Sequence, residues 1–197
     1  AAIAASTLPG ALQTPDSTLM VWRADALGDV RRVPLSPQPV IRQQAGGWTV
    51  VRDEGLLDKL SALREGKLPN ETGGVLLGSF DVERAIVYLA DALPSPPDSE
   101  EWPTLYIRGS KGLRPAVDRI HQATHSMIEY VGEWHSHPRG VRAAASQDDL
   151  DVFAWLTSLM EAEGLPAVMM IVGDPGNTSC FVGEIKGEEN LLQGVLP

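Results

Sequence analysis

Two histidines and several carboxylates stand close together in the stretch Gly132-Glu-Trp-His-Ser-His-Pro138 and shortly after it. His135 and His137 are two residues apart, so their side chains point to one side of an extended segment but to different sides of a helix. We therefore expect them at the end of a strand. Neutral imidazoles are common zinc ligands, and one further protein ligand leaves a fourth position for water. Asp149 or Asp148, at the start of the next helix, is the candidate third ligand.

Hydrolysis at a zinc site needs a general base that takes a proton from the water. Two glutamates are candidates for this role. Glu133 has the same strand parity as His135, and Glu71 stands at the entrance of an apolar strand that follows Gly73 and Gly74. The residue pattern alone leaves both glutamates open.

Other reactive side chains have simpler explanations. His121 and His125 are four apart on a predicted helix, but Gln122 stands where a zinc protease of that spacing has a glutamate, so we expect two surface histidines. Cys180 lies in an apolar strand without an activating neighbour, which favours a core residue over the nucleophile of a cysteine-dependent enzyme. Ser136, between the two histidines, should point away from them by strand alternation.

Hydrophobic periodicity and turn residues predict an α/β layer with a mixed sheet. The expected strands cover residues 48–51, 74–78, 84–90, 128–134, 167–172 and 180–185. The expected helices run from about 56 to 66, from 113 to 126, and from a cap at Ser146 to about 164. Residues 94–103 contain four prolines and are predicted to be an exposed loop without regular structure.

Composition limits the class of protein. The chain has 197 residues, 43% of them hydrophobic, which suffices for one domain with a tail. Residues 1–45 are expected to be a proline-rich arm or linker with a strand-like run at 18–23, and residues 46–197 the catalytic domain. The net charge of -10 disfavours nucleic acid as a partner. No apolar run reaches the roughly 20 residues that cross a bilayer. A single cysteine fits a reducing compartment, so we expect a cytoplasmic protein. The chain starts with Ala rather than Met, so we expect a piece of a longer protein.

A glutamate ahead of a Gly-Gly strand, then His-Ser-His-Pro, then Ser-x-x-Asp at a helix start forms a specific combination. Over residues 54–185 the chain resembles the JAMM/MPN+ (JAB domain) zinc metalloprotease family of the prokaryotic type. This resemblance implies the JAB/MPN, cytidine-deaminase-like architecture, in which a mixed β-sheet is flanked by helices. It also implies that His135, His137 and Asp149 hold Zn²⁺ and that Glu71 is the general base.

Ser146 resembles the family serine that helps to hold the scissile carbonyl oxygen, although a helix N-cap is an equally good reading of this residue. One feature departs from the family pattern. Eight residues separate His137 from Ser146, one more than in that pattern. Keeping Ser-x-x-Asp together selects Asp149 as the third ligand, whereas counting from His137 selects Asp148. We prefer Asp149 because a loop absorbs an extra residue more easily than the first turn of a helix.

The resemblance implies an isopeptidase or peptidase that cleaves after the C-terminal tail of a ubiquitin-like protein, by deconjugation or precursor processing. Similar bacterial proteins occur beside or fused to ubiquitin-activating-like (ThiF-type) proteins, including in antiphage defence operons, so such a protein is an expected partner. Arg108, Arg139 and Arg142 are candidate contacts to the bound tail. The alternative is an inactive MPN-type scaffold that binds protein partners and holds no metal.

Overall fold

The computed structural model describes residues 19–24, 29–35 and 39–185. The chain divides into two compact units, residues 1–39 and 40–197, and each is described by itself. In the first unit β1 (Leu19–Ala24) pairs antiparallel with β2 (Val30–Leu35), and β1 contains most of the predicted strand-like run. The second unit begins with β3 (Val40–Ala45), earlier than the predicted domain start at residue 46. The reason is a Gly46-Gly47 turn that folds β3 back onto β4 as a hairpin.

The second unit is built on a mixed sheet of seven strands in the order β11-β10-β9-β5-β6-β4-β3. Strands β9 and β10 are parallel, as are β4 and β6, and the other neighbours are antiparallel. The predicted mixed sheet is therefore confirmed. The bounds of the remaining six strands are β4 Trp48–Asp53, β5 Gly73–Asp81, β6 Ile86–Leu93, β9 Glu129–Ser136, β10 Ala167–Val172 and β11 Thr178–Gly183.

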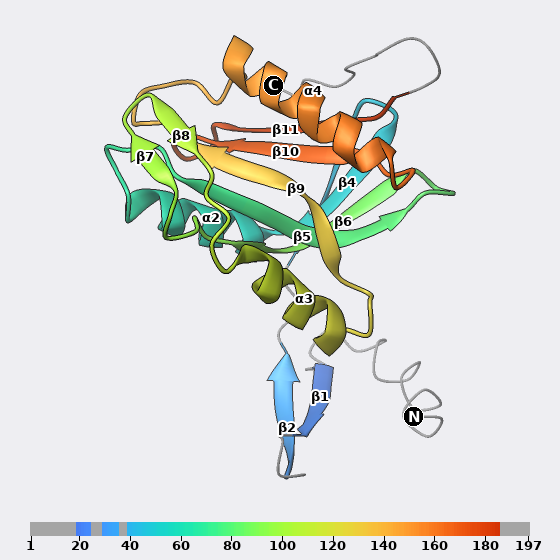
Figure 1. Cartoon of the computed structure of the whole chain (residues 1–197). Helices are drawn as coiled ribbons and strands as arrows, with labels where there is room; N and C mark the ends of the chain where they lie inside the picture. Colours follow the sequence, from blue (N-terminus) through green and yellow to red (C-terminus); the bar gives the residue numbers. More distant parts are fainter. Residues whose placement is uncertain (1–18, 25–28, 36–38, 186–197) are drawn as a thin grey trace. The chain divides into compact units, whose positions relative to one another are not determined.

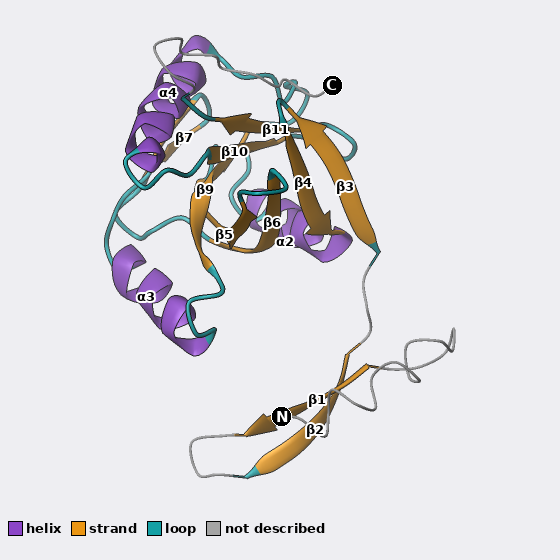
Figure 2. Cartoon of the chain, turned by 90° about the vertical axis from the view of Figure 1, so that its right-hand side faces the viewer, coloured by secondary structure: helices purple, strands orange, loops and turns teal. Residues whose placement is uncertain are grey.

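Three helices of the described residues flank the sheet: α2 (Glu54–Glu65), α3 (Leu113–Ala123) and α4 (Gln147–Glu161). Helix α2 lies against one face and α4 against the other, while α3 lies beside β9 (Figures 1 and 2). Helix α3 ends before the predicted residue 126, because His125 and Ser126 have positive φ angles that a helix does not allow. None of the described helices is long and apolar enough to span a membrane.

Alternate residues of the central strands serve the two faces. Val168, Met170 and Val172 of β10 join the cluster that contains Leu56 and Leu60 of α2. Met169 and Ile171 join the cluster of Phe153, Leu156 and Met160 from α4. Neighbouring strands share this alternation, and Met169 and Ile171 are the register partners of Glu133 and His135 on β9. Glu133 and His135 therefore face α4, whereas Trp134 and Ser136 are buried on the α2 side.

The prediction that residues 94–103 lack regular structure is wrong at one end. Glu100–Trp102 forms β7, which pairs antiparallel with β8 (Leu105–Ile107) across a Pro103-Thr104 turn. The four prolines stand before and after these three residues, so none of them removes a backbone donor from the ladder. This small hairpin was not expected as an element, and it lies next to the candidate site.

Candidate active site

The two histidines of the motif lie at the carboxyl end of β9, between β5 and β10. His135 is in the strand itself, and His137 follows its last residue. The His137 backbone N–H donates to the carbonyl of Val172 (3.0 Å). The rings are neighbours, with centroids 5.3 Å apart. The predicted position at a strand end is confirmed.

Asp149 reaches both histidines from the first turn of α4. Its Oδ1 lies 3.1 Å from Nε2 of His135 and its Oδ2 lies 3.8 Å from Nε2 of His137. A capping box orients it: the Asp149 N–H donates to the Ser146 hydroxyl oxygen, and the Ser146 N–H donates to Asp149 Oδ2. The structure thus brings Asp149 to the histidines. Asp148 borders a cavity next to these three side chains, described below, but is not a member of the group.

The three side chains fit a metal ion. Their ligand atoms all lie within 4.8 Å of one another, and ligands about 2.0–2.2 Å from a tetrahedral zinc are about 3.3 Å apart. Nε2 of His135 is buried without a hydrogen-bond partner among the described residues, since its 3.1 Å approach to Asp149 is not aligned for a hydrogen bond. Nδ1 of His137 lies 2.8 Å from the carbonyl of Arg142, and its Nε2 faces Asp149 at 3.8 Å. Two such inward nitrogens beside a carboxylate are a donor set of the kind that holds zinc.

The electrostatics of the group agree with this reading. Burial raises the pKa of Asp149, but the His135 and His137 rings and the Ser146 hydroxyl together hold that pKa far below the usual range of an aspartate. Burial lowers the pKa of His137, and Asp149 and the Arg142 carbonyl outweigh it and raise the pKa. Asp149 is therefore a carboxylate, the form that binds a cation.

Glu71 is held close to the histidines by contacts of its neighbour Thr72. The Ser136 N–H donates to the Thr72 carbonyl (2.7 Å) and the Thr72 N–H donates to the Ser136 hydroxyl (3.1 Å). On the other side the Glu71 N–H donates to the carbonyl of Trp102 on β7 (2.9 Å). We call His135, His137 and Asp149 the candidate metal group, or metal group for short. Ser136 points away from it, as predicted, and fixes the segment that carries Glu71.

The two candidate bases differ in their surroundings. Glu71 is half-buried on the wall of the cavity, and burial raises its pKa although the His137 and His135 rings lower it. Glu133 also borders the cavity, but its Oε1 is paired with Arg108 at 2.8 Å and accepts a hydrogen bond from Tyr130 at 3.2 Å. Glu71 is therefore the freer of the two to exchange a proton.

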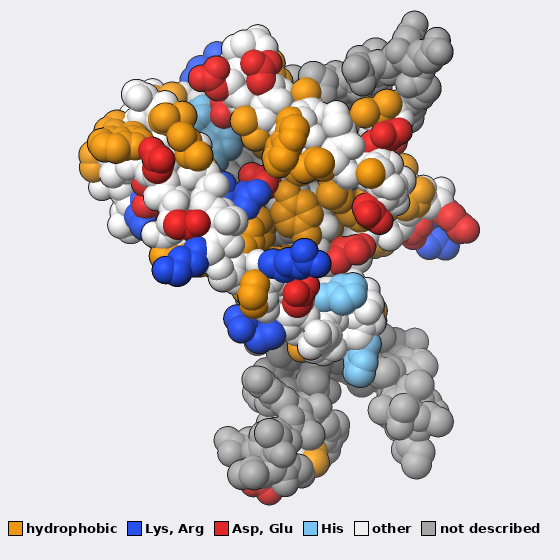
Figure 3. Space-filling view, viewed as in Figure 1, with side chains coloured by type: hydrophobic (Ala, Val, Ile, Leu, Met, Phe, Trp, Pro, Cys, Tyr) orange, Lys and Arg blue, Asp and Glu red, His pale blue; other side chains and the backbone are white. Residues whose placement is uncertain are grey.

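A cavity of about 630 Å³ extends from the metal group between the β7–β8 hairpin and α4. Leu105 and Ile107 line the hairpin side, and Val152 and Trp155 line the α4 side; all four are exposed. Figure 3 shows hydrophobic side chains over both elements, with exposed histidine atoms between them. We call this cavity the apolar groove. The hairpin side and the α4 side of the groove were not predicted, because β8 was not expected as a strand and because Val152 and Trp155 lie off the core stripe of α4.

The remaining sequence candidates are not members of the group formed by His135, His137 and Asp149. His121 and His125 are not among the described residues that gather in a metal-binding geometry. Cys180 is buried in the core, and burial raises the pKa of its thiol to about 12, which excludes an activated nucleophile at neutral pH. Of the three arginines, Arg108 and Arg142 border the groove, with Arg108 paired to Glu133, while Arg139 is paired with Glu65.

Comparisons with known proteins give a consistent family. Residues 53–182 match the family model described as prokaryotic homologs of the JAB domain. A protein of Enterobacter hormaechei subsp. hoffmannii (strain UCI 50) named CD-NTase/cGAS isopeptidase is 36% identical over 110 residues, 55% of this chain and 59% of the relative. A protein of the same name from Escherichia coli (strain TW11681) is 29% identical over 110 residues, 52% of this chain and 62% of the relative. The chain thus spans about six-tenths of each of these relatives.

Two solved structures are also similar. One is the solution structure of protein DSY2949 from Desulfitobacterium hafniense, with 19% identity, a TM-score of 0.45, and coverage of 74% of this chain and 86% of that protein. The other is the crystal structure of AF2198, a JAB1/MPN domain protein from Archaeoglobus fulgidus, with 19% identity, a TM-score of 0.37, and coverage of 65% and 84%.

Proposed function

The chain belongs to the family of prokaryotic JAB-domain homologs, and on this premise we propose that it is a zinc-dependent isopeptidase or peptidase. It cleaves the amide that follows the extended C-terminal tail of a ubiquitin-like protein. The observation that carries the proposal is the convergence of His135, His137 and Asp149 at one end of the apolar groove, with Glu71 on the same wall.

His135, His137 and Asp149 hold the metal in this proposal. A zinc ion bound there supplies a Lewis acid that lowers the pKa of a water molecule and polarises the scissile carbonyl. Glu71 takes one proton from the attacking water and delivers it to the leaving amine nitrogen as the C–N bond breaks. The first products are a carboxylic acid on the tail and a free amine; the acid proton then passes to the amine to give a carboxylate and an ammonium, so atoms and charge balance.

Ser146 has two roles in the proposal. Its hydroxyl donates to Oδ2 of Asp149 (2.7 Å), in addition to the two backbone bonds of the capping box that orient Asp149. Its position on the cavity wall also allows the hydroxyl to rotate away from Oδ2 and donate its single proton to the carbonyl oxygen of the substrate as negative charge develops there. The apolar groove takes the residues of the tail that precede the cleaved bond, and β8 offers a strand edge with which an extended chain can pair.

The substrate is proposed from two sources. The family resemblance points to a ubiquitin-like protein, with a fused or adjacent ThiF-type protein as the enzyme that makes the conjugate. The name of the two bacterial relatives, CD-NTase/cGAS isopeptidase, makes a CD-NTase a second candidate for the cleaved protein. The single cysteine of the chain supports a reducing, cytoplasmic setting for this activity.

Two fluorescent reporters test the proposal. One carries a bacterial ubiquitin-like protein and the other a bacterial CD-NTase, each fused through its C-terminus to the reporter. We expect cleavage of at least one of them by the zinc-loaded protein. Glu71→Gln should lower kcat by on the order of 10²–10⁴ because it removes proton transfer, with KM little changed.

Glu133→Gln is the matched control, because Glu133 borders the same cavity but is paired with Arg108. It should cost far less activity than Glu71→Gln. If Glu133→Gln removes cleavage and Glu71→Gln does not, Glu133 is the base. If the protein holds no zinc and cleaves neither reporter nor conjugates made from them, the scaffold alternative replaces the enzyme.

A further inference from the structure

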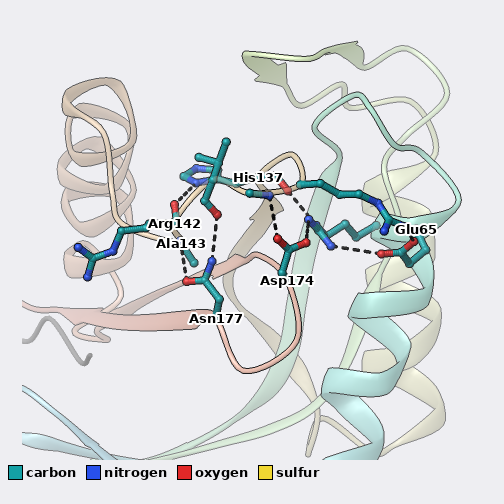
Figure 4. A network of polar contacts seen from close by, with 10 residues as sticks. Glu65, His137, Arg142, Ala143, Asp174 and Asn177 are labelled. Carbon is teal, nitrogen blue, oxygen red and sulfur yellow. Dashed lines mark hydrogen bonds and ion pairs between the residues drawn. The ribbon is translucent and has the colours of Figure 1, made fainter.

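The loop between the two halves of the metal group, residues 138–145, has no helix or strand of its own, but its backbone is held at three points. The Gly140 N–H donates to Oδ2 of Asp174 (2.8 Å), and the Ala143 N–H donates to Oδ1 of Asn177 (2.9 Å). Nδ2 of Asn177 donates to the Val141 carbonyl (2.9 Å). Both partner residues, Asp174 and Asn177, belong to the turn between β10 and β11 (Figure 4).

This turn is itself fixed. The Gly173 N–H donates to the Asn177 carbonyl and the Asn177 N–H donates to the Asp174 carbonyl, both at 2.8 Å. Gly173 leaves the space that the Asn177 side chain occupies, since a Cβ there would lie 2.5 Å from Nδ2 of Asn177. The turn therefore presents its amide and carboxylate in one arrangement.

Arg64 of α2 joins the turn to His137. Its side chain is only 2% exposed, and its Nε donates to the His137 carbonyl (2.8 Å) while Nη2 donates to Oδ1 of Asp174 (2.8 Å). Asp174 consequently bridges Arg64 and Gly140. A buried guanidinium is unfavourable without hydrogen-bond partners, and here the His137 carbonyl and the Asp174 carboxylate supply them in fixed positions.

These contacts converge on the ring of His137. The loop places the Arg142 carbonyl 2.8 Å from Nδ1, between the two points at which Asn177 holds Val141 and Ala143. A carbonyl at Nδ1 keeps the proton on that nitrogen and leaves Nε2 as the metal ligand. We propose that Asp174 and Asn177, with Arg64, are positioning residues that set the ring tautomer and orientation of His137 for the metal. This inference rests on the proposed function, because it takes His137 as a metal ligand.

The test measures zinc affinity by competition with a chromophoric chelator in the whole chain. Asn177→Ala should weaken zinc binding by about 10–100-fold, since the loop that orients His137 is released. Asn177→Asp keeps the acceptor for Ala143 but loses the donor to Val141, and it should fall between Asn177→Ala and the wild type. The ligand-field spectrum of the Co²⁺-substituted protein should change in Asn177→Ala.

Asp81→Ala is the matched control, because Asp81 accepts the Arg84 N–H in another hairpin turn, between β5 and β6. It should leave zinc affinity and the Co²⁺ spectrum as in the wild type, whatever it does to the melting temperature of the metal-free protein. If Asn177→Ala binds zinc like the wild type, Asn177 is a structural turn residue and the inference is overturned. If the wild type binds no zinc, the proposed function fails and the inference falls with it.

Discussion

The two faces of the main sheet use adjacent residues for different purposes. On the α2 face the side chains of β9, β10 and β11 are closed into a core, and the buried charge of Arg64 has partners on all sides. On the α4 face the core stops beside the metal group and gives way to the apolar groove. Alternate residues of β9 therefore have different roles. Ser136 and Trp134 are buried and stabilise the fold, whereas Glu133 and His135 face the cavity.

The largest change in stability should come from a substitution on the α2 face. Leu60 is fully buried, and Leu60→Ala should lower the free energy of unfolding by about 2–5 kcal/mol, because it removes a packed side chain and leaves a cavity. Zinc content and kcat/KM measured well below the melting temperature should stay near those of the wild type. Urea denaturation of the metal-free protein gives the stability change.

Leu159→Ala on α4 is the control for this substitution, since Leu159 is of the same type and half exposed. Its effect on stability should stay within about 0.5 kcal/mol. A zinc affinity that falls with Leu60→Ala in the folded protein would show that the two faces are not separate.

An intermediate effect should come from the groove wall. Trp155→Ala should lower kcat/KM for the tail reporter by roughly 5–30-fold, mostly through KM, since it removes an aromatic contact of about 1–2 kcal/mol. Trp102→Ala is the control, because Trp102 is 57% exposed, close to the 55% of Trp155, but does not line the groove. Equal losses from the two substitutions would refute the groove as the binding site of the tail.

At neutral pH the smallest effect should be that of Cys180 on the closed face, and it grows only in alkaline solution. Burial raises the pKa of its thiol from 9.0 to about 12, so the folded state favours the neutral thiol. The contribution of this thiol to the free energy of unfolding is complete below pH 9.0. It is lost as the pH rises from there toward 12, by up to about 1.4 kcal/mol per pH unit. Wild type should therefore lose stability more steeply than Cys180→Ala between pH 9 and 11, and equal slopes would mean that the α2 face is open to solvent.

Local patterns in the sequence predicted much of this arrangement. The spacing of His135 and His137 gave their shared strand end, and Ser146 gave the start of α4, because both depend on neighbours in the chain. Strand β10 was predicted with its observed ends, since an apolar run of 6 residues between turn residues is too short for a buried helix. The hairpin β7–β8 was missed because the nearby prolines suggested an irregular segment.

The positioning contacts could not be read from the sequence in the same way. Arg64 meets Asp174 over 110 positions and His137 over 73, and only the folded sheet brings these segments together. A partial signal existed, because Arg64 continues the buried stripe of Leu56 and Leu60 at a spacing of four. A charge on an apolar stripe indicates a buried partner but does not say which residue it is.

Zinc content per chain tests the central claim most directly. Protein purified without chelator should hold one zinc ion in the wild type and in Asp148→Asn, and close to none in His135→Ala or Asp149→Asn, because each of the latter two removes one of three protein ligands. A wild type without stoichiometric zinc, or a His135→Ala variant that retains it, would contradict the account.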